Sequence, residues 1–264
     1  MARGLGVRAS RFAPGAGGTS LSLNFTAGSL DSSITFTRAS SGTRFNSAGT
    51  LVTETTNVAR FDYNPSTLAA LGLLMEEART NLCLQSEVFG TTWVPTLASI
   101  SSNAIAAPDG NTTADKLVED ATVTNTHLDV QSLTFTAAAH TFSVFAKAAE
   151  RTWIRLIIFD GTTAFAAYFN IGSGAVGTIT GAATATIQTI NTGYYRCVLT
   201  ATTLAAAGNV AIRLATADNG DTYTGNGSSG AYLWGAQVEA AAFATSYIAT
   251  TTIAVTRALD VATI

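Results

Sequence analysis

The sequence predicts a mostly β protein, with a jelly-roll β-sandwich that follows an N-terminal attachment region. From Thr80 onward, short segments rich in Val, Ile, Phe, Tyr and Thr alternate with turn signals such as Asn-Thr-Gly. Proline is rare, with 4 residues in a chain of 264, whereas glycine is frequent, with 23. Apolar residues at helical spacing occur in only one stretch. Many short strands packed in two sheets account for this pattern.

The attachment region is expected to span residues 1–79. Residues 1–30 are rich in Gly, Ser and Ala, and are expected to form an arm that orders against a partner. Alternating apolar residues and two turn signals between residues 34 and 50 predict a hairpin. The following stretch, NPSTLAALGLLMEEARTN, predicts the one short helix of the chain, because Pro65 suits a helix start and four apolar residues have helical spacing. Those four are Leu68, Leu71, Leu74 and Met75.

The sandwich is expected to span residues 80–264 with roughly eight to ten strands. Segments such as HTFSVFAK and RTWIRLIIF alternate or run apolar between turns, as strands of a two-sheet core do. The segment GAYLWGAQVE, residues 230–239, is predicted to be a late strand whose large aromatic side chains mainly fill the core. The residues after it are expected to return along the domain toward the attachment region.

The composition points to a surface covered by Thr, Ser, Asn and Gly. Charged residues make up 12% of the chain, about half the usual share. A surface so poor in charge often belongs to a protein in an assembly, where neighbouring chains bury part of it, and a robust extracellular β protein would look similar. The net charge is −3, and no basic patch with aromatic residues is present, so nucleic acid is not an expected partner. No apolar run is long enough for membrane insertion.

Motifs for catalysis are not found, and the chain is not expected to be an enzyme. Cys83 and Cys197 lie in apolar segments and are expected to be free and buried. His127 and His140 have no second ligand at metal-binding spacing. The sequence has no nucleophile elbow and no phosphate-binding loop. Glycoside hydrolysis needs two acids that face each other across a cleft, but most acids of this chain lie in turn-like segments. The candidates are Asp115, Glu119, Asp120, Asp160, Asp218, Asp221 and Glu239.

Two pairs of carboxylates are candidates for a structural calcium ion, although no cofactor is required by any motif. Asp218 and Asp221 supply hard oxygen atoms in the turn ADNGD, as calcium prefers. Glu87 and Glu239 would approach each other if the first and last strands of the sandwich are neighbours. A plain turn accounts equally well for the first pair.

Carbohydrate binding is a second candidate function, because exposed aromatic rings stack on sugars beside a few polar groups. The candidates are Trp153, at the start of a strand, and Tyr223, in a loop, together with Trp93 and Tyr194. Packing in the core is the alternative interpretation for each of them.

Several segments together resemble a group of bacteriophage virion proteins. Residues 72–94, GLLMEEARTNLCLQSEVFGTTWV, and residues 232–260, YLWGAQVEAAAFATSYIATTTIAVTRALD, are similar to segments of phage tail fibres, head fibres or spikes with a carbohydrate-binding-module-like jelly roll. Residues 30–51 and 59–67 resemble the segment that precedes this module, and HTFSVFAKA and GYYRCVLTA resemble its middle strands.

The resemblance implies a structural protein of the virion, assembled in the host cytoplasm together with other virion proteins. It implies a homo-oligomer, with a trimer favoured, and adhesion to host-surface polysaccharide. It carries over no catalytic residue.

Three interpretations therefore stay open. The chain is a virion protein that binds glycans, a purely structural spike or head decoration protein, or a polysaccharide-active enzyme or its accessory module. Aromatic side chains gathered in one groove would favour the first, a flat surface of Ser and Thr the second, and two acids across a cleft the third.

Overall fold

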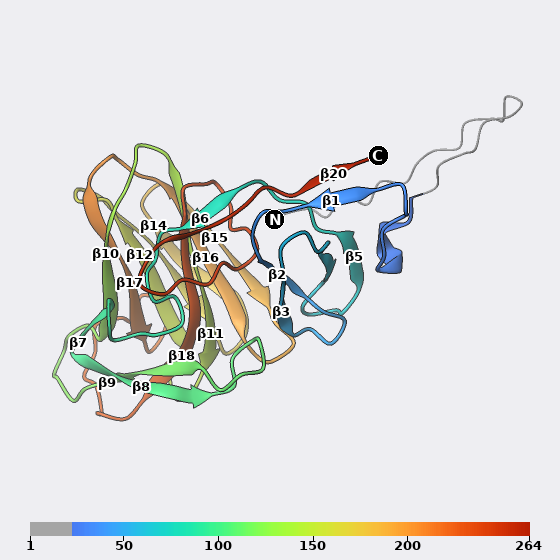
Figure 1. Ribbon diagram of the computed structural model, residues 1–264. Coiled ribbons are helices and arrows are strands. Elements are labelled where there is room, and N and C mark those ends of the chain that lie inside the picture. The colour runs from blue at the N-terminus through green and yellow to red at the C-terminus, as the bar shows by residue number, and fades with distance from the viewer. Residues whose placement is uncertain (1–22) are drawn as a thin grey trace, which may run out of the picture.

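The computed structural model describes residues 23–264, and it is built almost entirely of β-strands (Figure 1). The arm expected over residues 1–30 lies for the most part outside this range. Two six-stranded sheets pack face to face, and all pairs of neighbouring strands are antiparallel. The mostly β, jelly-roll sandwich predicted from the sequence is thus confirmed. Within the described residues, no helix is both long and apolar enough to cross a membrane.

The first sheet, called sheet I, has the strand order β14-β13-β12-β17-β10-β7. Its strands are β7 (Val94–Thr96), β10 (Leu128–Thr134), β12 (Trp153–Phe159), β13 (Ala164–Asn170), β14 (Ala175–Thr180) and β17 (Ala207–Ala215).

The second sheet, called sheet II, has the strand order β15-β16-β11-β18-β9-β8. Its strands are β8 (Ala98–Ile105), β9 (Ala114–Glu119), β11 (Ala139–Ala148), β15 (Ala183–Thr189), β16 (Tyr195–Thr202) and β18 (Gly230–Glu239). Twelve strands exceed the eight to ten expected, partly because residues 94–119 form three strands from a polar stretch that carries little apolar alternation.

The main core lies between the two sheets and follows from the period of two in each strand. On β12, for example, Ile154, Leu156 and Ile158 point inward and are fully buried, whereas Trp153 and Arg155 lie on the outer face. The thiols of Cys83 and Cys197 are free and buried, as predicted. Burial raises the pKa of both thiols.

A second core covers the outer face of sheet II. Trp234 belongs here rather than between the sheets, as do Phe45, Tyr194 and Tyr247. The Trp234 indole donates a hydrogen bond from Nε1 to the Thr113 hydroxyl, at 3.1 Å. The predicted burial of the large aromatic side chain of this strand is correct, but the layer that buries it is formed by the N-terminal and C-terminal segments.

The N-terminal segments contain a 3₁₀ turn and six short strands. The turn is Phe25–Ala27, and the strands are β1 (Thr35–Thr37), β2 (Gly42–Phe45), β3 (Leu51–Glu54), β4 (Phe61–Tyr63), β5 (Ala70–Leu73) and β6 (Arg79–Asn81). Strands β2 and β3 form the predicted hairpin. The C-terminal strands β19 (Val255–Arg257) and β20 (Val261–Thr263) return to pair with β6 and β1. The domain boundary expected at residue 79 therefore falls inside the β6–β19 pair, and Figure 1 shows β20 beside β1.

The prediction of a helix after Pro65 is wrong. Its residues form the turn and second strand of the β4–β5 hairpin instead. The Asn64 carboxamide oxygen accepts hydrogen bonds from the backbone N–H groups of Ser66 and Thr67, each at 2.9 Å, and Leu68 has a φ of 61°. Such local bonding and a left-handed residue both interrupt a helix. The apolar residues of this stretch do not form one buried stripe, because Leu71 and Met75 are exposed.

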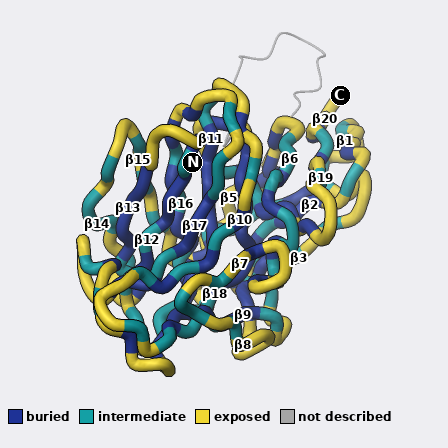
Figure 2. Tube along the Cα trace, turned by 90° about the vertical axis from the view of Figure 1, so that its left-hand side faces the viewer, coloured by how far each residue is buried: buried dark blue, intermediate teal, exposed yellow. Residues whose placement is uncertain are grey.

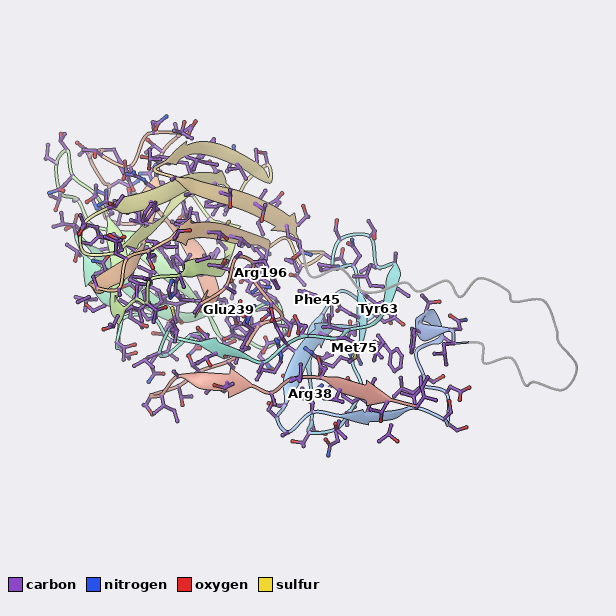
Figure 3. The ribbon with its side chains drawn as sticks, turned by 90° about the horizontal axis from the view of Figure 1, so that it is seen from above. Arg38, Phe45, Tyr63, Met75, Arg196 and Glu239 are labelled. Atoms are coloured by element: carbon purple, nitrogen blue, oxygen red, sulfur yellow. The ribbon has the colours of Figure 1, made fainter. Side chains whose placement is uncertain are left out.

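Buried ion pairs join the N-terminal segments to the C-terminal return. Asp260 contacts Arg38 at 3.2 Å and also pairs with Arg60, while Glu76 contacts Arg60 at 2.8 Å and Arg257 at 2.9 Å. All five side chains are almost inaccessible to solvent. In Figure 3, Arg38 lies among the N-terminal strands, away from Arg196 and Glu239 at the side of the sandwich. Each guanidinium also donates to a backbone carbonyl oxygen, which offsets part of the cost of burying its charge, although Nε of Arg60 and of Arg257 has no partner among the described residues.

Strand β18 contains a β-bulge that changes which of its residues point to each face of sheet II. Phe145 pairs with Trp234 and Ser143 with Gln237, so β18 has one residue more than β11 over this stretch. Gly235 has a φ of 63°, as expected at such a bulge. A Cβ atom there would lie 3.0 Å from the Phe145 ring and 3.2 Å from the Tyr247 ring. Both the backbone conformation and the packing therefore require glycine.

We expect Gly235→Ala to lower the free energy of unfolding by about 2–4 kcal/mol, since a left-handed alanine costs about 1–3 kcal/mol and the two rings must also move. Urea denaturation measures this loss. Gly227→Ala is the matched control, because Gly227 has a φ of 77° but its Cβ would meet no atom closer than 3.9 Å. Equal losses in the two variants would contradict the packing argument.

Asp129 is a fully buried carboxyl group on the inner face of β10. Its Oδ1 accepts a hydrogen bond from the Val130 N–H at 3.1 Å, and its Oδ2 has no partner among the described residues. Burial is the main cause that raises the pKa of Asp129 to about 7, and the nearby Asp115 carboxyl raises it further. The folded protein therefore holds a proton here that the unfolded chain releases near pH 4.

The pKa of Asp129 is higher in the folded protein than in the unfolded chain. Its contribution to the free energy of unfolding is therefore complete below about pH 4 and is lost as the pH rises to about 7. Over this range the free energy of unfolding falls by at most about 1.4 kcal/mol per pH unit. We expect Asp129→Asn to remove this part of the pH dependence while leaving the fold intact. Urea denaturation between pH 4 and pH 8 measures the slope. Asp218→Asn, at an exposed position, should keep it, and an unchanged slope in Asp129→Asn would contradict the assignment.

Candidate functional site

The outer face of sheet I is the face of the sandwich that the N-terminal and C-terminal strands leave open. In Figure 2 this sheet faces the viewer with its strands in order from β14 to β7, and β1, β2, β19 and β20 lie to its right. The strand pairs set the rows of side chains across this face. One row runs from Leu128 through Arg213 and Arg155 to Tyr168, and a neighbouring row is apolar. The apolar row contains Val130, Ala211, Ile157 and Ala166.

Trp153 lies on this face at the start of β12 and is partly exposed. Its ring packs over Gly177 of β14 beside the Asp218 carboxylate, since an added Cβ atom at Gly177 would lie 2.5 Å from Asp218 Oδ1 and 2.7 Å from the indole. Among the described residues, no atom accepts a hydrogen bond from the indole Nε1–H. A partly exposed indole beside polar side chains is a group that can contact a ligand.

Asp221 gathers three side chains of the same face. Its Oδ1 accepts a hydrogen bond from the Tyr168 hydroxyl at 2.6 Å, and its Oδ2 accepts from Arg155 at 3.0 Å and from Arg213 at 2.9 Å. Burial alone would raise the pKa of Asp221, but the hydrogen bonds from Tyr168 and both arginines outweigh it and lower the pKa. Burial and the Asp221 carboxylate together raise the pKa of Tyr168 to about 12. Asp221 is therefore ionised and Tyr168 neutral at ordinary pH.

Tyr223, predicted to be in a loop and a glycan-binding candidate, lies away from this face at one end of the sandwich. Its hydroxyl donates to Glu119 at 2.7 Å, and the Arg151 guanidinium lies over its ring at 4.9 Å. The His127 ring is 4.8 Å away. The Tyr223 ring therefore packs against two protein side chains, and the structure does not bring Tyr223 together with Trp153.

Trp93 and Tyr194 are buried, and neither ring has a face that a sugar could reach. Trp93 is 1% exposed in the main core and stacks near Phe142. Tyr194 is 0% exposed in the second core and donates a hydrogen bond to the carbonyl oxygen of Ala106. For these two residues the structure supports the alternative of core packing.

The proposed calcium ligands have protein partners in this structure. Asp218 accepts from the backbone N–H and the hydroxyl of Thr178, at 2.8 and 2.9 Å. Asp221 pairs with two arginines, as described above. Glu87 accepts from the Tyr247 hydroxyl at 2.9 Å, whereas Glu239 binds Thr245 and Gln237. Within residues 23–264, no three His, Cys, Asp or Glu side chains lie close enough to hold a metal ion.

Other acids considered for catalysis have structural contacts. Asp115 accepts from the backbone N–H groups of Phe89 and Asn103, and Asp160 accepts from those of Thr163 and Leu204. Glu119 forms an ion pair with Arg151. Carboxylates held in this way fix loops and strand ends.

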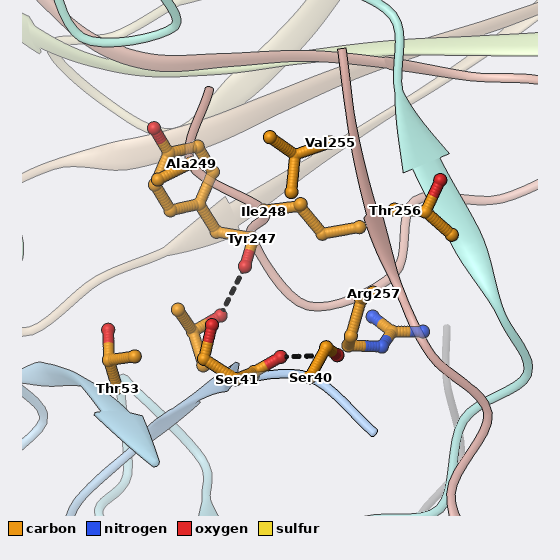
Figure 4. Close-up of a pocket in the computed structure, with 11 residues that line it drawn as sticks. Ser40, Ser41, Thr53, Tyr247, Ile248, Ala249, Val255, Thr256 and Arg257 are labelled. Carbon is orange, nitrogen blue, oxygen red and sulfur yellow. Dashed lines mark hydrogen bonds between the residues drawn. The ribbon is translucent and has the colours of Figure 1, made fainter. Parts of the chain in front are cut away.

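A small cavity of about 90 Å³ lies between the β2–β3 hairpin and the C-terminal return (Figure 4). Hydroxyl groups and the buried Arg257 contribute to its lining. The Thr43 hydroxyl donates to the carbonyl oxygen of Tyr247 at 2.6 Å, and the Ser40 hydroxyl donates to that of Ser41 at 2.9 Å. Because the Thr43 bond joins the hairpin to the C-terminal return, the cavity is a feature of the junction between these two chain segments.

Arg155 and Arg213 belong to the site but were not among the residues predicted from sequence patterns. Alternation from Trp153 along β12 places residue 155 on the same face, and this signal could have found Arg155. No sequence pattern places Arg213 opposite Arg155, because the pairing of β12 with β17 joins strands separated by almost 50 residues.

No protein-family model matches the chain, and no curated protein matches it. Among solved structures, a domain of tailspike protein 4 from bacteriophage CBA120 is 13% identical with a TM-score of 0.35, over 60% of this chain and 21% of that one. A xylanase from Clostridium thermocellum with CBM22-1 and GH10 modules is 9% identical with a TM-score of 0.35, over 67% of this chain and 30% of that one. This chain thus spans less than a third of either protein.

A carbohydrate-binding module that recognises mannan, TmCBM27, is 8% identical with a TM-score of 0.32. The alignment covers 63% of this chain and 97% of the module.

We expect a chelator to leave the melting temperature unchanged. Asp221 is already paired with two arginines, and the carboxylate oxygens of Asp218 and Glu239 already accept hydrogen bonds from the protein. Thermal melts in EDTA and in calcium chloride make the comparison. Asp218→Asn and Glu87→Gln serve as paired variants. A fall of several degrees in EDTA that either variant abolishes would instead support calcium at that position.

Proposed function

We propose that this chain is a structural protein of a phage virion whose β-sandwich binds host-surface glycans on the outer face of sheet I. The observation that carries the glycan-binding part is the combination of Trp153 with the Asp221 cluster on this open face. An aromatic ring beside fixed hydrogen-bonding groups is what sugar recognition requires, since pyranose rings offer apolar faces and polar edges.

The arrangement of the chain supports this division of roles. The N-terminal segments and the C-terminal return occupy the outer face of sheet II, so that side is available for attachment to other virion proteins. The outer face of sheet I points away from the N-terminal strands, as the views in Figures 1 and 2 agree. A ligand there would meet no part of the attachment side.

The virion location rests on the resemblance of residues 72–94 and 232–260 to phage fibre and spike proteins. The low share of charged residues supports a homo-oligomer, for which a trimer is the favoured symmetry. Assembly in the host cytoplasm with other virion proteins follows from this proposal. A purely structural spike or decoration protein is the second candidate, and it is favoured by the buried ion pairs that unite both ends of the described chain in one rigid junction.

We expect Trp153→Ala to weaken binding to a host polysaccharide about tenfold or more, because it removes the aromatic platform from the centre of the contact. A glycan array with polysaccharides from candidate bacterial hosts identifies the ligand, and titration calorimetry with that ligand measures the loss. The variant should melt within a few degrees of the parent.

Tyr232→Ala is the control, because Tyr232 is a partly exposed aromatic residue on the outer face of sheet II. It should bind as the parent does. Equal losses in both variants would argue against sheet I as the binding face. No binding of the parent protein to any glycan would favour the purely structural role.

A further inference from the structure

We infer that Phe159 and Asn209 form a second sugar-binding position on the outer face of sheet I, so that the ligand is an uncharged chain of several sugars. This inference rests on the proposed function and specifies the length and the charge of the glycan for the same face. Neither residue was among those predicted from sequence patterns to bind a glycan.

The first argument is the orientation of Phe159, at the end of β12. Ile154, Leu156 and Ile158 of this strand point into the main core. The alternation of side chains therefore places Phe159 on the outer face, together with Trp153. The Phe159 ring is partly exposed and belongs to neither the main core nor the second core. Such a ring offers an apolar surface to the face of a pyranose ring.

The second argument is the set of side chains around Phe159. Its cross-strand neighbours are Ala164 of β13, which is exposed, and Asn209 of β17, which is partly exposed. Among the described residues, no side chain or backbone group forms a hydrogen bond with the Asn209 carboxamide, so its donors and its acceptor are available. Ser132 of β10 is opposite Asn209 and adds an exposed hydroxyl group. An apolar ring beside a few polar groups suits a sugar.

The third argument is that Trp153, at the other end of β12, has the same kinds of neighbours. Asn170 of β13 and Ala215 of β17 are opposite Trp153. The Asn170 Oδ1 accepts hydrogen bonds from two backbone N–H groups of the following turn. Its Nδ2 has no partner within residues 23–264. Each aromatic ring thus has one alanine and one asparagine beside it, which favours two equivalent positions of one binding face.

The fourth argument is the distance between the two rings. Trp153 and Phe159 are six residues apart on one strand, which places them about 20 Å from each other. This distance is several times the width of one pyranose ring, so only a chain of sugars reaches both. Arg155 and Ile157 lie between them on the same face. Asp221 meets this face at Arg155, so the loop that carries Asp221 lies nearer to Trp153 than to Phe159.

The fifth argument is the balance of charge on this face. Arg155 and Arg213 both pair with Asp221. The Asp218 carboxylate lies beside the Trp153 indole. Two positive and two negative charges therefore lie close together, and the side chains at the other end of β12 are uncharged. The face has no unmet charge for an acidic or a basic sugar, so an uncharged glycan fits it best.

The experiment compares neutral disaccharides with hexasaccharides of the same sugar by titration calorimetry on the full chain. The probes are cellobiose and cellohexaose, mannobiose and mannohexaose, and maltose and maltohexaose, with alginate as an acidic polysaccharide. We expect at least one hexasaccharide to bind about tenfold or more tightly than its disaccharide, because only the longer chain reaches both rings. Raising the sodium chloride concentration should leave this affinity unchanged, since salt screens charges.

Phe159→Ala should weaken hexasaccharide binding about tenfold and remove most of its advantage over the disaccharide. Phe243→Ala is the matched control, because it removes the same ring from an exposed position on the C-terminal return. It should bind as the parent does. Asn209→Ala should weaken hexasaccharide binding about fivefold, because it removes hydrogen bonds and leaves both rings in place. The parent and all variants are first compared by thermal melting.

Equal affinity for a disaccharide and its hexasaccharide, lowered by Trp153→Ala but not by Phe159→Ala or Asn209→Ala, would overturn this inference and leave the proposed function standing. A loss in Phe243→Ala as large as that in Phe159→Ala would also overturn it, because the effect would then not be specific to this face. Tighter binding of alginate than of every neutral probe would contradict the uncharged ligand. Failure of the parent to bind any glycan would overturn both.

Discussion

The buried ion pairs of Glu76 and Asp260 with three arginines are the interaction on which the arrangement of the chain depends. Arg38 and Arg60 come from the N-terminal segments, whereas Asp260 and Arg257 come from the C-terminal return. Removing one partner would leave a buried charge unpaired, which typically costs about 3–5 kcal/mol. The pairs therefore make separation of the two segments costly, and they explain why both ends of the described chain stay on one side of the sandwich.

This junction decides which face of the sandwich is open. The segments that it joins cover the outer face of sheet II, where Phe45, Trp234 and Tyr247 form the second core. The bulge at Gly235 shifts the alternation of side chains in the middle of β18. As a result Trp234 packs in the second core, whereas Leu233, Ala236 and Val238 pack in the main core. The outer face of sheet I has no such layer of strands. The loop after β17 contacts it through Asp218 and Asp221, and Trp153, Arg155 and Arg213 stay partly exposed there. Attachment and ligand binding are thus assigned to opposite sides of one fold.

Local pattern was enough where side chains alternate between an apolar core and another environment. Most strands of the sandwich, the β2–β3 hairpin and the free buried cysteines follow from such patterns. The pattern failed at residues 65–75, because Asn64 and Leu68 favour a turn that leucine spacing does not reveal. It also failed for Trp93 and Tyr194, since an aromatic residue in a short strand can face either a core or solvent, and only the packing of distant segments distinguishes the two.

A mostly β sandwich with a buried aromatic strand near its end can be predicted from sequence patterns, because period-two alternation and turn residues act over short distances. The sequence also places Trp153 among the candidates for ligand binding. Three features become visible only in the folded chain: Trp234 lies in a second core, Asp221 pairs with two arginines, and Arg155 lies opposite Arg213. These features depend on strand pairs and ion pairs between residues far apart in the chain, for which a single sequence carries no local signal.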